Sequence, residues 1–493
     1  MYYHTRVLSI AILLMAALSM SSAQYAEDVL RFSQWNNPVG ARTLGIGGAA
    51  VGIADDFSAL FTNPAGLASI RDFEFSLGLS NLSYNNDTKF FGLTTPSDNR
   101  STNLNSLGLV YPVATQRGSL TFAFGYGRVA SFATSAAFNG FNSQSSIIES
   151  MTPGNNLNAM SKDAKEKFLD NNIPYQIFLA NIDSVYGKLL PVVSGNVLQN
   201  GTVREGGGIN NWSLGGAIDI AKNLSLGVGI NILSGSYSYD RVFTETDSKD
   251  FYTDTRPKPL YDFDRFRLES TINSDLTGYN VLFGLMYRKQ GSYKIGASIR
   301  TPSYYDISES FADRGRSWFD NGDNYDIDLP GETKYSIKTP MVMSAGASFQ
   351  VRDFLVFAGD VEYIDWTEME FTTDNLDLQD ENRHILDTYQ ATVNLRGGVE
   401  ISLFDLGVKL RAGMVYQPSP YKVDQDKTDF DQQYYTFGAG YKIDDNVTIN
   451  AAFATGKWKT LRDNYYLNGL PATSSTDESV KTSTLSVTLS YRF

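Results

Sequence analysis

The C-terminal segment of the chain alternates strictly between apolar and polar residues. In "TSTLSVTLSYRF", Leu485, Val487 and Leu489 fall on one face, and the polar residues between them fall on the other. This alternation is typical of a β-strand with one apolar and one polar side. Fourteen segments of this kind predict an all-β fold, and they lie at residues 72–84, 103–113, 118–131, 209–221, 223–245, 264–289, 292–310, 333–350, 354–370, 388–402, 406–417, 432–443, 446–458 and 480–493.

The connections between these segments alternate between short and long. The long ones are rich in Asp, Asn and Gly, and they lie at 132–208, 246–263, 311–332, 371–387, 418–431 and 459–479. One rim of tight turns, one rim of long loops and an even strand number are typical of a bacterial outer-membrane barrel with periplasmic termini. A periplasmic or extracellular all-β protein is the alternative, but it gives no reason for this segregation of loop lengths. We therefore predict a 14-stranded antiparallel transmembrane β-barrel.

Charged residues within the segments support this prediction. They fall on the face opposite the aliphatic one, where they would line a wet lumen instead of lipid. The terminal Phe493 resembles the C-terminal signal that barrel-assembly machinery recognises. We expect that machinery, outer-membrane lipid and lipopolysaccharide as partners. The charges are Lys294, Arg300, Arg396, Glu400, Lys409 and Arg411.

Composition narrows the possible functions further. Residues 1–23 read as a secretory signal peptide, with an apolar core followed by small residues. The mature chain contains no cysteine, so thiolate metal sites are excluded, and we expect neither a metal nor a cofactor. A net charge of −13 argues against nucleic acid as a partner, because binding phosphates needs a basic face.

A barrel of fourteen strands needs something inside it. Eight strands leave an interior that side chains fill and sixteen leave an aqueous channel, so fourteen strands would leak without a plug. Residues 24–70 precede the first strand, and the glycines between Gly40 and Gly52 allow close packing in a confined space. We assign residues 24–70 to an internal hatch and residues 71–493 to the barrel.

The hatch ends in "FTNPAGLASI", which contains an Asn-Pro step. Proline disfavours helical geometry at the residue before it, so a first helical turn should stop at Asn63. Asn63 can then cap a second turn, with Pro64 at its first position. The sequence therefore predicts a rigid corner between hatch and wall. The alternative is that this segment is only a stable entry to the first strand.

The segment "GARTLGIGGAAVGIADDFSALFTNPAGLASI" resembles the N-terminal signature of FadL-type outer-membrane transporters. Asp55, Asp56, Ser58, Asn63, Pro64, Ala65, Gly66 and Leu67 carry the resemblance. It implies a hatch-filled barrel that imports long-chain fatty acids and other hydrophobic molecules. It also implies that Asn63, Pro64 and Ala65 lie beside a kink in the third strand that opens the wall sideways. We expect this kink at Gly125 and Gly127, since glycine weakens strand pairing.

Two groups of residues are candidates for contact with substrate. Helical spacing in residues 157–193 predicts amphipathic helices, on which Phe178 and Ile182 form an apolar groove. The alternative is that these helices merely cover the barrel mouth. For a carboxylate ligand, Lys294, Arg300, Arg396 or Arg411 could supply the charge. We favour the alternative that these cations pair with Glu400, Asp360 or Glu362.

Two other functions remain open at this stage. Some FadL-like barrels serve as shuttles in protein secretion and others are called haem receptors, so an interaction protein is the first rival. An outer-membrane lipase or protease is the second. It would need a nucleophile with a base, and His384 is the single imidazole of the mature chain.

Overall fold

The computed structural model describes residues 22–152, 154, 156–253, 262–289, 291–372, 376–422, 430–467 and 474–493. The predicted signal peptide falls almost wholly on residues outside these ranges and stays a prediction. Within the described part of the chain, no helix is both long and apolar enough to cross a membrane.

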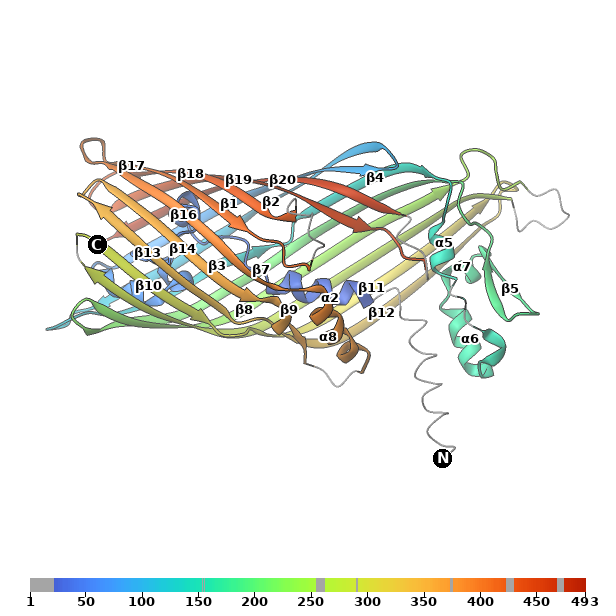
Figure 1. Ribbon diagram of the computed structural model, residues 1–493, viewed down its shortest axis with the longest axis horizontal. Coiled ribbons are helices and arrows are strands. Elements are labelled where there is room, and N and C mark those ends of the chain that lie inside the picture. The colour runs from blue at the N-terminus through green and yellow to red at the C-terminus, as the bar shows by residue number, and fades with distance from the viewer. Residues whose placement is uncertain are drawn as a thin grey trace, which may run out of the picture.

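The wall is one closed antiparallel sheet, in which β1 pairs with β2 on one side and with β20 on the other (Figure 1). Eighteen strands form fourteen wall positions, because four positions consist of two consecutive strands: β3 with β4, β10 with β11, β12 with β13, and β14 with β15. The predicted 14-stranded barrel is therefore confirmed. The strands are β1 (Glu74–Phe90), β2 (Leu93–Val113), β3 (Leu120–Ser131), β4 (Thr134–Asn142), β7 (Val197–Ala221), β8 (Leu224–Thr246), β9 (Phe263–Lys289), β10 (Tyr293–Arg300), β11 (Tyr304–Phe319), β12 (Asn324–Lys338), β13 (Val342–Val351), β14 (Leu355–Asp365), β15 (Glu370–Phe371), β16 (Ala391–Leu403), β17 (Val408–Gln417), β18 (Gln432–Lys442), β19 (Val447–Asp463) and β20 (Ser475–Arg492).

Helices occupy the lumen and the loops. Figure 1 shows the N-terminal helices inside the barrel and α5, α6 and α7 at one end of it. The hatch contains α2 (Ser22–Ser33), α3 (Ala41–Gly45), α4 (Ala59–Thr62) and the 3-10 helix η1 (Pro64–Ser69). The loops contain α5 (Ile147–Ser150), η2 (Leu157–Ala159), α6 (Lys162–Asp170), α7 (Ile173–Gln176), the hairpin β5 (Ala180–Asp183) and β6 (Lys188–Pro191), η4 (Trp366–Glu368), α8 (Leu376–Thr388) and η5 (Phe404–Leu406).

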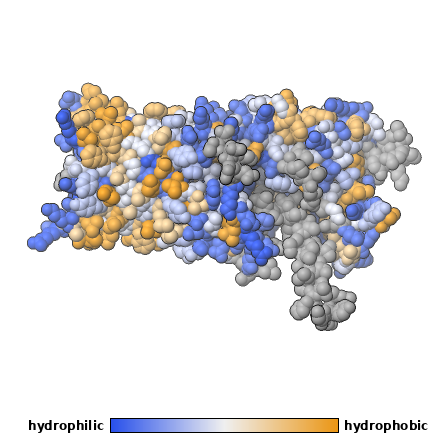
Figure 2. Space-filling view, in the orientation of Figure 1, coloured by the Kyte–Doolittle hydropathy of each residue, from blue (hydrophilic) through white to orange (hydrophobic). Residues whose placement is uncertain are grey.

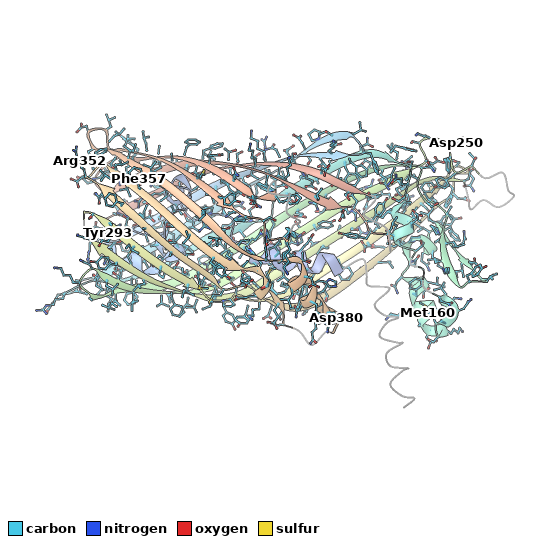
Figure 3. The ribbon with its side chains drawn as sticks, viewed as in Figure 1. Met160, Asp250, Tyr293, Arg352, Phe357 and Asp380 are labelled. Atoms are coloured by element: carbon cyan, nitrogen blue, oxygen red, sulfur yellow. The ribbon has the colours of Figure 1, made fainter. Side chains whose placement is uncertain are left out.

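The two ends of the barrel differ. The C-terminus, Tyr293 and Arg352 lie at the end with short turns, which we call the short-turn end (Figure 3). Asp250 and Met160 lie at the opposite end, which we call the loop end. Outward apolar residues gather towards the short-turn end, and polar residues cross the middle of the barrel (Figure 2).

The outer face of β8 shows this change along a single strand. Leu226, Val228, Ile230 and Ile232 are exposed near the short-turn end, and the next outward residues are serines, beginning at Ser234. About ten residues of a tilted strand span an apolar layer of ~25 Å, so most of the 23 residues of β8 extend beyond such a layer. We call the zone of exposed apolar residues near the short-turn end the apolar band.

Two predicted loops were wrong because the strands continue past the apolar band. In residues 132–208, β4 and the first part of β7 form a paired ladder, so the loop proper covers residues 143–196. In residues 311–332, β11 and β12 run up to a turn at residues 320–323. The apolar–polar alternation disappears there because the outward residues, such as Asp306 and Arg316, face water.

The predicted helix over residues 173–193 was also wrong beyond its first turn. After α7, Phe178 adopts a positive φ of 61°, which a helix does not allow. The chain then forms the β5–β6 hairpin, whose turn is held by the Asp183 carboxylate accepting from the Val185 and Tyr186 amides. The apolar residues of this segment lie in two short strands, and their spacing alone did not distinguish these strands from a helix.

Candidate functional site

The hatch rests on a ring of glycines that line the lumen. A Cβ atom at any of these positions would crowd hatch atoms. On β2, β3 and β7 these atoms belong to hatch side chains, and from β8 to β18 they include the hatch backbone, which there lies directly against the wall. Glycine permits this close approach because it has no side chain. Apart from Gly125 and Gly127, the sequence analysis did not use these glycines, although they recur at lumen-facing positions of successive strands. They are Gly108, Gly125, Gly127, Gly215, Gly227, Gly284, Gly296, Gly346, Gly398, Gly413 and Gly438.

The Asn-Pro corner has the predicted local geometry. Asn63 is extended, ends α4 and caps η1, with its side-chain oxygen accepting from the Ala65 amide at 3.2 Å. Its side-chain nitrogen donates to the Val51 carbonyl at 3.0 Å and to the Leu285 carbonyl at 3.1 Å. Asn63 is fully buried. The corner therefore ties two parts of the hatch to β9 of the wall.

The position of the corner differs from the expectation. Asn63, Pro64 and Ala65 meet Gly227, Gly284 and Gly296 on β8, β9 and β10, where the wall is continuously paired. At Gly125 and Gly127 of β3, the neighbours are instead the aromatic rings of Phe57 and Phe61 and the side chain of Val39. The expected juxtaposition failed because the family signature does not say which wall strand each hatch residue reaches.

The wall does break beside β3, just past these glycines. The β2–β3 ladder runs from Val113–Leu120 to Ser106–Gly127 and ends there. Beyond it, residues 93–105 of β2 pair only with β1, and β4 pairs only with β7. Between β2 and the end of β3, the described wall therefore has no backbone ladder, although β4 lies close to both β1 and β2.

The hatch fills this break with a second Asn-Pro step, Asn36-Asn37-Pro38. The Asn37 amide donates to the Val129 carbonyl at 3.0 Å, and its side chain donates to the Arg128 carbonyl at 2.6 Å. The Asn36 side chain bonds both the carbonyl and the amide of Ser131. These residues take the place that β2 would hold in a continuous ladder. The sequence analysis missed them, although an Asn-Asn-Pro step ahead of Gly40 was a visible signal.

Polar groups without partners gather along the break. The side-chain oxygens of Ser131, Thr134 and Asn139 are buried and accept or donate no hydrogen bond among the described residues. From the β2 side, Asn99 bridges the break through bonds of 2.9 Å to the carbonyls of Thr134 and Glu205. The break is therefore held by side chains, in contrast to the backbone ladders of the remaining wall.

The break begins at the edge of the apolar band. On the outer face, the Trp212 ring lies 5.1 Å from Tyr126 and 5.9 Å from Phe124. Tyr126 pairs with Leu107, one step below the last pair of the β2–β3 ladder. Aromatic residues in this position mark the interface between hydrocarbon and polar groups in membrane barrels. The break thus opens at that interface.

Three of the four predicted substrate-binding cations are paired with carboxylates. Lys294 lies 2.8 Å from Asp55 of the hatch, and Arg396 lies 2.6 Å from Glu362. Arg411 lies 2.7 Å from Glu400. The pairing that we favoured therefore holds for Arg396 and Arg411 with the expected partners, and Lys294 has a hatch partner that we did not foresee.

Arg300 differs from the other three cations. It forms no ion pair within the described ranges, and its guanidinium carbon lies 3.8 Å from the centre of the Trp35 ring of the hatch. A guanidinium over an aromatic face is stabilised by cation–π attraction of about 0.5–2 kcal/mol. Of the four predicted cations, Arg300 is therefore the one that remains able to bind a carboxylate.

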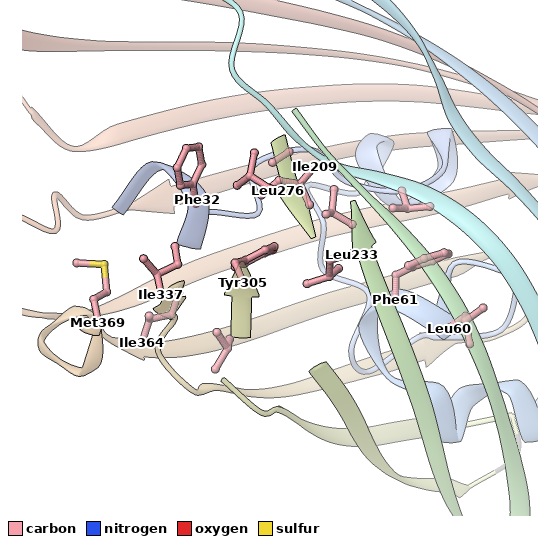
Figure 4. Packing of buried hydrophobic residues seen from close by; sticks show 14 of the residues in the cluster. Phe32, Leu60, Phe61, Ile209, Leu233, Leu276, Tyr305, Ile337, Ile364 and Met369 are labelled. Carbon is pink, nitrogen blue, oxygen red and sulfur yellow. The ribbon is translucent and has the colours of Figure 1, made fainter. Parts of the chain in front are cut away.

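One apolar cluster connects the surroundings of Arg300 with the break. It contains Tyr305 and Ile364, which Figure 4 shows, and also Val129 and Phe132 of the third wall position, and Trp35 packs against it. Figure 4 shows Phe32 of α2 among these residues, and its ring lies 5.7 Å from that of Phe132. The lumen thus contains a continuous apolar path whose middle is occupied by α2.

Phe178 and Ile182 do not form a common groove. Phe178 is partly exposed and its ring lies 4.4 Å from that of Tyr325 on β12. Ile182 packs against a separate small cluster that contains Leu157 and Leu189. His384 is exposed on α8. No group of three or more metal-ligating side chains occurs in the described part of the chain.

Comparisons with known proteins agree with the fold. Residues 209–493 match the family described as outer membrane protein transport protein (OMPP1/FadL/TodX). In fold, the chain is similar to a FadL homologue of Pseudomonas aeruginosa, with 14% identity, a TM-score of 0.55, and coverage of 92% of this chain and 98% of that one.

The chain is also similar in fold to the toluene transporter TodX of P. putida, with 14% identity, a TM-score of 0.51, and coverage of 89% of this chain and 94% of that one. It is likewise similar in fold to the monoaromatic hydrocarbon channel CymD, with 14% identity, a TM-score of 0.51, and coverage of 93% of this chain and 99% of that one. No curated protein matches the sequence. Because the family match covers more than half of the chain, the protein belongs to the OMPP1/FadL/TodX family of outer-membrane transport proteins, which are transporters and not enzymes.

Proposed function

We propose that this protein takes up hydrophobic small molecules, such as long-chain fatty acids, by passive diffusion through the break between β2 and β3. In this proposal the loop end faces the outside of the cell, and the short-turn end, with the C-terminus, faces the periplasm. The observation that supports it most is the apolar cluster that runs from Arg300 to Val129 and Phe132, next to the open backbone. A hydrophobic molecule that leaves the lumen through the break enters the membrane and does not have to cross a polar route into the periplasm.

The residues of the path have distinct roles in the proposal. Arg300 attracts the carboxylate of a fatty acid, which replaces the Trp35 ring as its partner, because a charge-assisted hydrogen bond is stronger than the cation–π contact. The apolar cluster holds the acyl chain. Release needs α2 and Asn36-Asn37 to move away from the path and the break. Each of these segments is held by local side-chain contacts, so a ligand that competes for the same space can displace them.

A disulfide across the break tests the lateral route. The chain contains no cysteine, so Asn36→Cys with Ser131→Cys adds one defined crosslink between hatch and β3. We expect oxidation to lower uptake of labelled oleate by at least tenfold in cells that carry this variant, and reduction to restore it. Undiminished uptake with the crosslink fully formed would refute the route.

A matched pair controls for the effect of crosslinking itself. Thr455→Cys with Ser483→Cys places the disulfide between cross-strand partners of β19 and β20, away from the break. This variant should transport normally in both redox states. If it loses transport as well, rigidity of the whole barrel would explain the result, and the lateral route would lose its support.

A substitution of Arg300 tests whether the substrates are acidic or neutral. We expect Arg300→Gln to lower oleate uptake about tenfold and to leave uptake of a neutral hydrocarbon such as toluene within twofold. An equal loss for both compounds would mean that Arg300 only supports the hatch through Trp35. In that case neutral hydrophobic compounds, and not fatty acids, become the proposed substrates.

A further inference from the structure

Two lysines face each other on the outer wall. Lys457 of β19 and Lys481 of β20 are direct cross-strand partners, and both side chains are exposed on the face that carries Phe453 and Leu485. Neither ammonium group lies within ion-pair distance of a carboxylate among the residues described. Like charges directly opposite each other destabilise a sheet. The wall therefore contains an uncompensated positive pair.

The height of this pair on the wall indicates what could neutralise it. Below it, the outer face of β19 and β20 is apolar from Val447 and Tyr491 up to Phe453 and Leu485. From Tyr491 to Lys481 the chain rises about 33 Å along the strand, or ~25 Å along the barrel axis at a tilt of about 40°. The apolar band of a membrane barrel has this height. The two ammonium groups thus stand where the polar headgroups begin.

The charges around the pair are mixed in sign. Arg100 of β2 lies two strands from Lys481 and one row closer to the apolar band, as the pairs Ser83–Arg100 and Ser83–Ser483 show. Two exposed carboxylates lie nearby: Asp98 of β2 in the row of Lys481, and Asp87 of β1 one row farther from the apolar band. Among the described residues neither carboxylate forms an ion pair with the two lysines, which remain direct cross-strand partners.

We propose that Lys457 and Lys481 together bind a phosphate group of lipopolysaccharide in the surrounding outer leaflet, with Arg100 available to a second phosphate. A phosphate between the two lysines turns their repulsion into two charge-assisted contacts. A headgroup phosphate meets this requirement because the membrane holds it at the height of the pair. The site rests on the membrane orientation given above and not on the uptake route, so the experiments on the break can fail without affecting it.

The sign of a stability change tests this site. In neutral detergent, Lys481→Gln removes a repulsion, so the purified full-length barrel should unfold at a higher temperature than the unchanged protein. In micelles that contain bis-phosphorylated lipid A, the same variant loses a phosphate contact and should unfold at a lower temperature. A shift of the same sign in both media would overturn the proposal.

Binding of lipid A gives a second readout. A basic residue near an anionic surface contributes about fivefold to binding, so K457Q/K481Q should weaken binding of bis-phosphorylated lipid A about 25-fold. K457R/K481R should bind as before, and K165Q/K167Q, which removes two lysines from α6 at the loop end, should have no effect. Dephosphorylated lipid A should bind all variants equally. If millimolar inorganic phosphate displaced bis-phosphorylated lipid A from the protein, the site would be one for free anions, and the lipid assignment would be refuted.

Discussion

The hatch contains two Asn-Pro steps that meet the wall in different ways. At Asn63-Pro64 the wall is fully paired, and the buried asparagine makes three hydrogen bonds, one to the wall backbone at Leu285 and two to the hatch backbone at Val51 and Ala65. At Asn36-Asn37-Pro38 the wall is open, and the asparagines supply the partners that β3 lacks. An Asn-Pro step therefore anchors the hatch at one place and substitutes for a strand at the other. We expect the Asn63-Pro64 step to stay fixed to the wall and the Asn36-Asn37-Pro38 step to be able to detach from β3.

The largest effect should come from replacing a wall glycine against which Asn63 packs. Gly284→Val puts a side chain where Asn63 and Ala65 lie, and backbone atoms cannot give way, so we expect a loss of about 3 kcal/mol or more. Urea unfolding in lipid vesicles measures it. Gly359→Val on the outer face of β14 is the matched control, since open space surrounds that position, and it should change the free energy of unfolding little.

Removing the anchor side chain should have the next largest effect. Asn63→Ala leaves the Val51 and Leu285 carbonyls and the Ala65 amide without their partner, so we expect a loss of about 2–4 kcal/mol in the free energy of unfolding. Uptake per folded molecule should change less than twofold. A strong loss of uptake in well-folded protein would instead assign the corner a direct part in the gate.

The second step should tolerate the same substitution better. Asn37→Ala removes one side-chain bond to the Arg128 carbonyl and keeps the backbone bond to Val129, so we expect a loss of about 1 kcal/mol. Amide exchange at residues 129–131 should become faster, and uptake should rise. If exchange there stays as slow as at residues 284–286, the two steps are equally fixed and the contrast between them is wrong.

The smallest effect concerns the contact that couples the hatch to Arg300. Trp35→Leu removes the aromatic face and should lower the free energy of unfolding by about 0.5–1 kcal/mol. Because Arg300 then has no partner to give up, binding of oleate to the purified protein should become tighter. Unchanged or weaker binding would show that Trp35 itself contacts the ligand.

Sequence reasoning was accurate where neighbouring residues decide the conformation. Asn63 and Pro64 fix their own dihedral angles and hydrogen bonds, so the cap was predicted correctly. The alternation in β19 and β20 was equally reliable, because lipid demands an apolar residue at every second position there. The same alternation was lost beyond the apolar band, since both faces of β11 and β12 tolerate polar residues, and the strand ends were therefore misplaced.

The candidate site was predictable only in part. Charge pairing was foreseen for Arg396 and Arg411 because charged residues that are largely buried are usually paired. The difference between Arg300 and the other cations depends on Trp35, which is 265 positions away in the chain and carries no local signal. For the same reason, the family resemblance implied a kink at Gly125 and Gly127 but not which hatch residues lie beside the end of the β2–β3 ladder.

The amino-acid sequence by itself determined the barrel, its strand number, the presence of a hatch and the geometry of the Asn63 corner. Each of these follows from periodicity, loop length or backbone restriction, which act over a few residues. Only the tertiary structure decided where the hatch touches the wall, where the wall opens and which luminal cation remains unpaired. Closing the sheet brings distant residues together, and local chemistry does not record which strand will lie opposite a given segment.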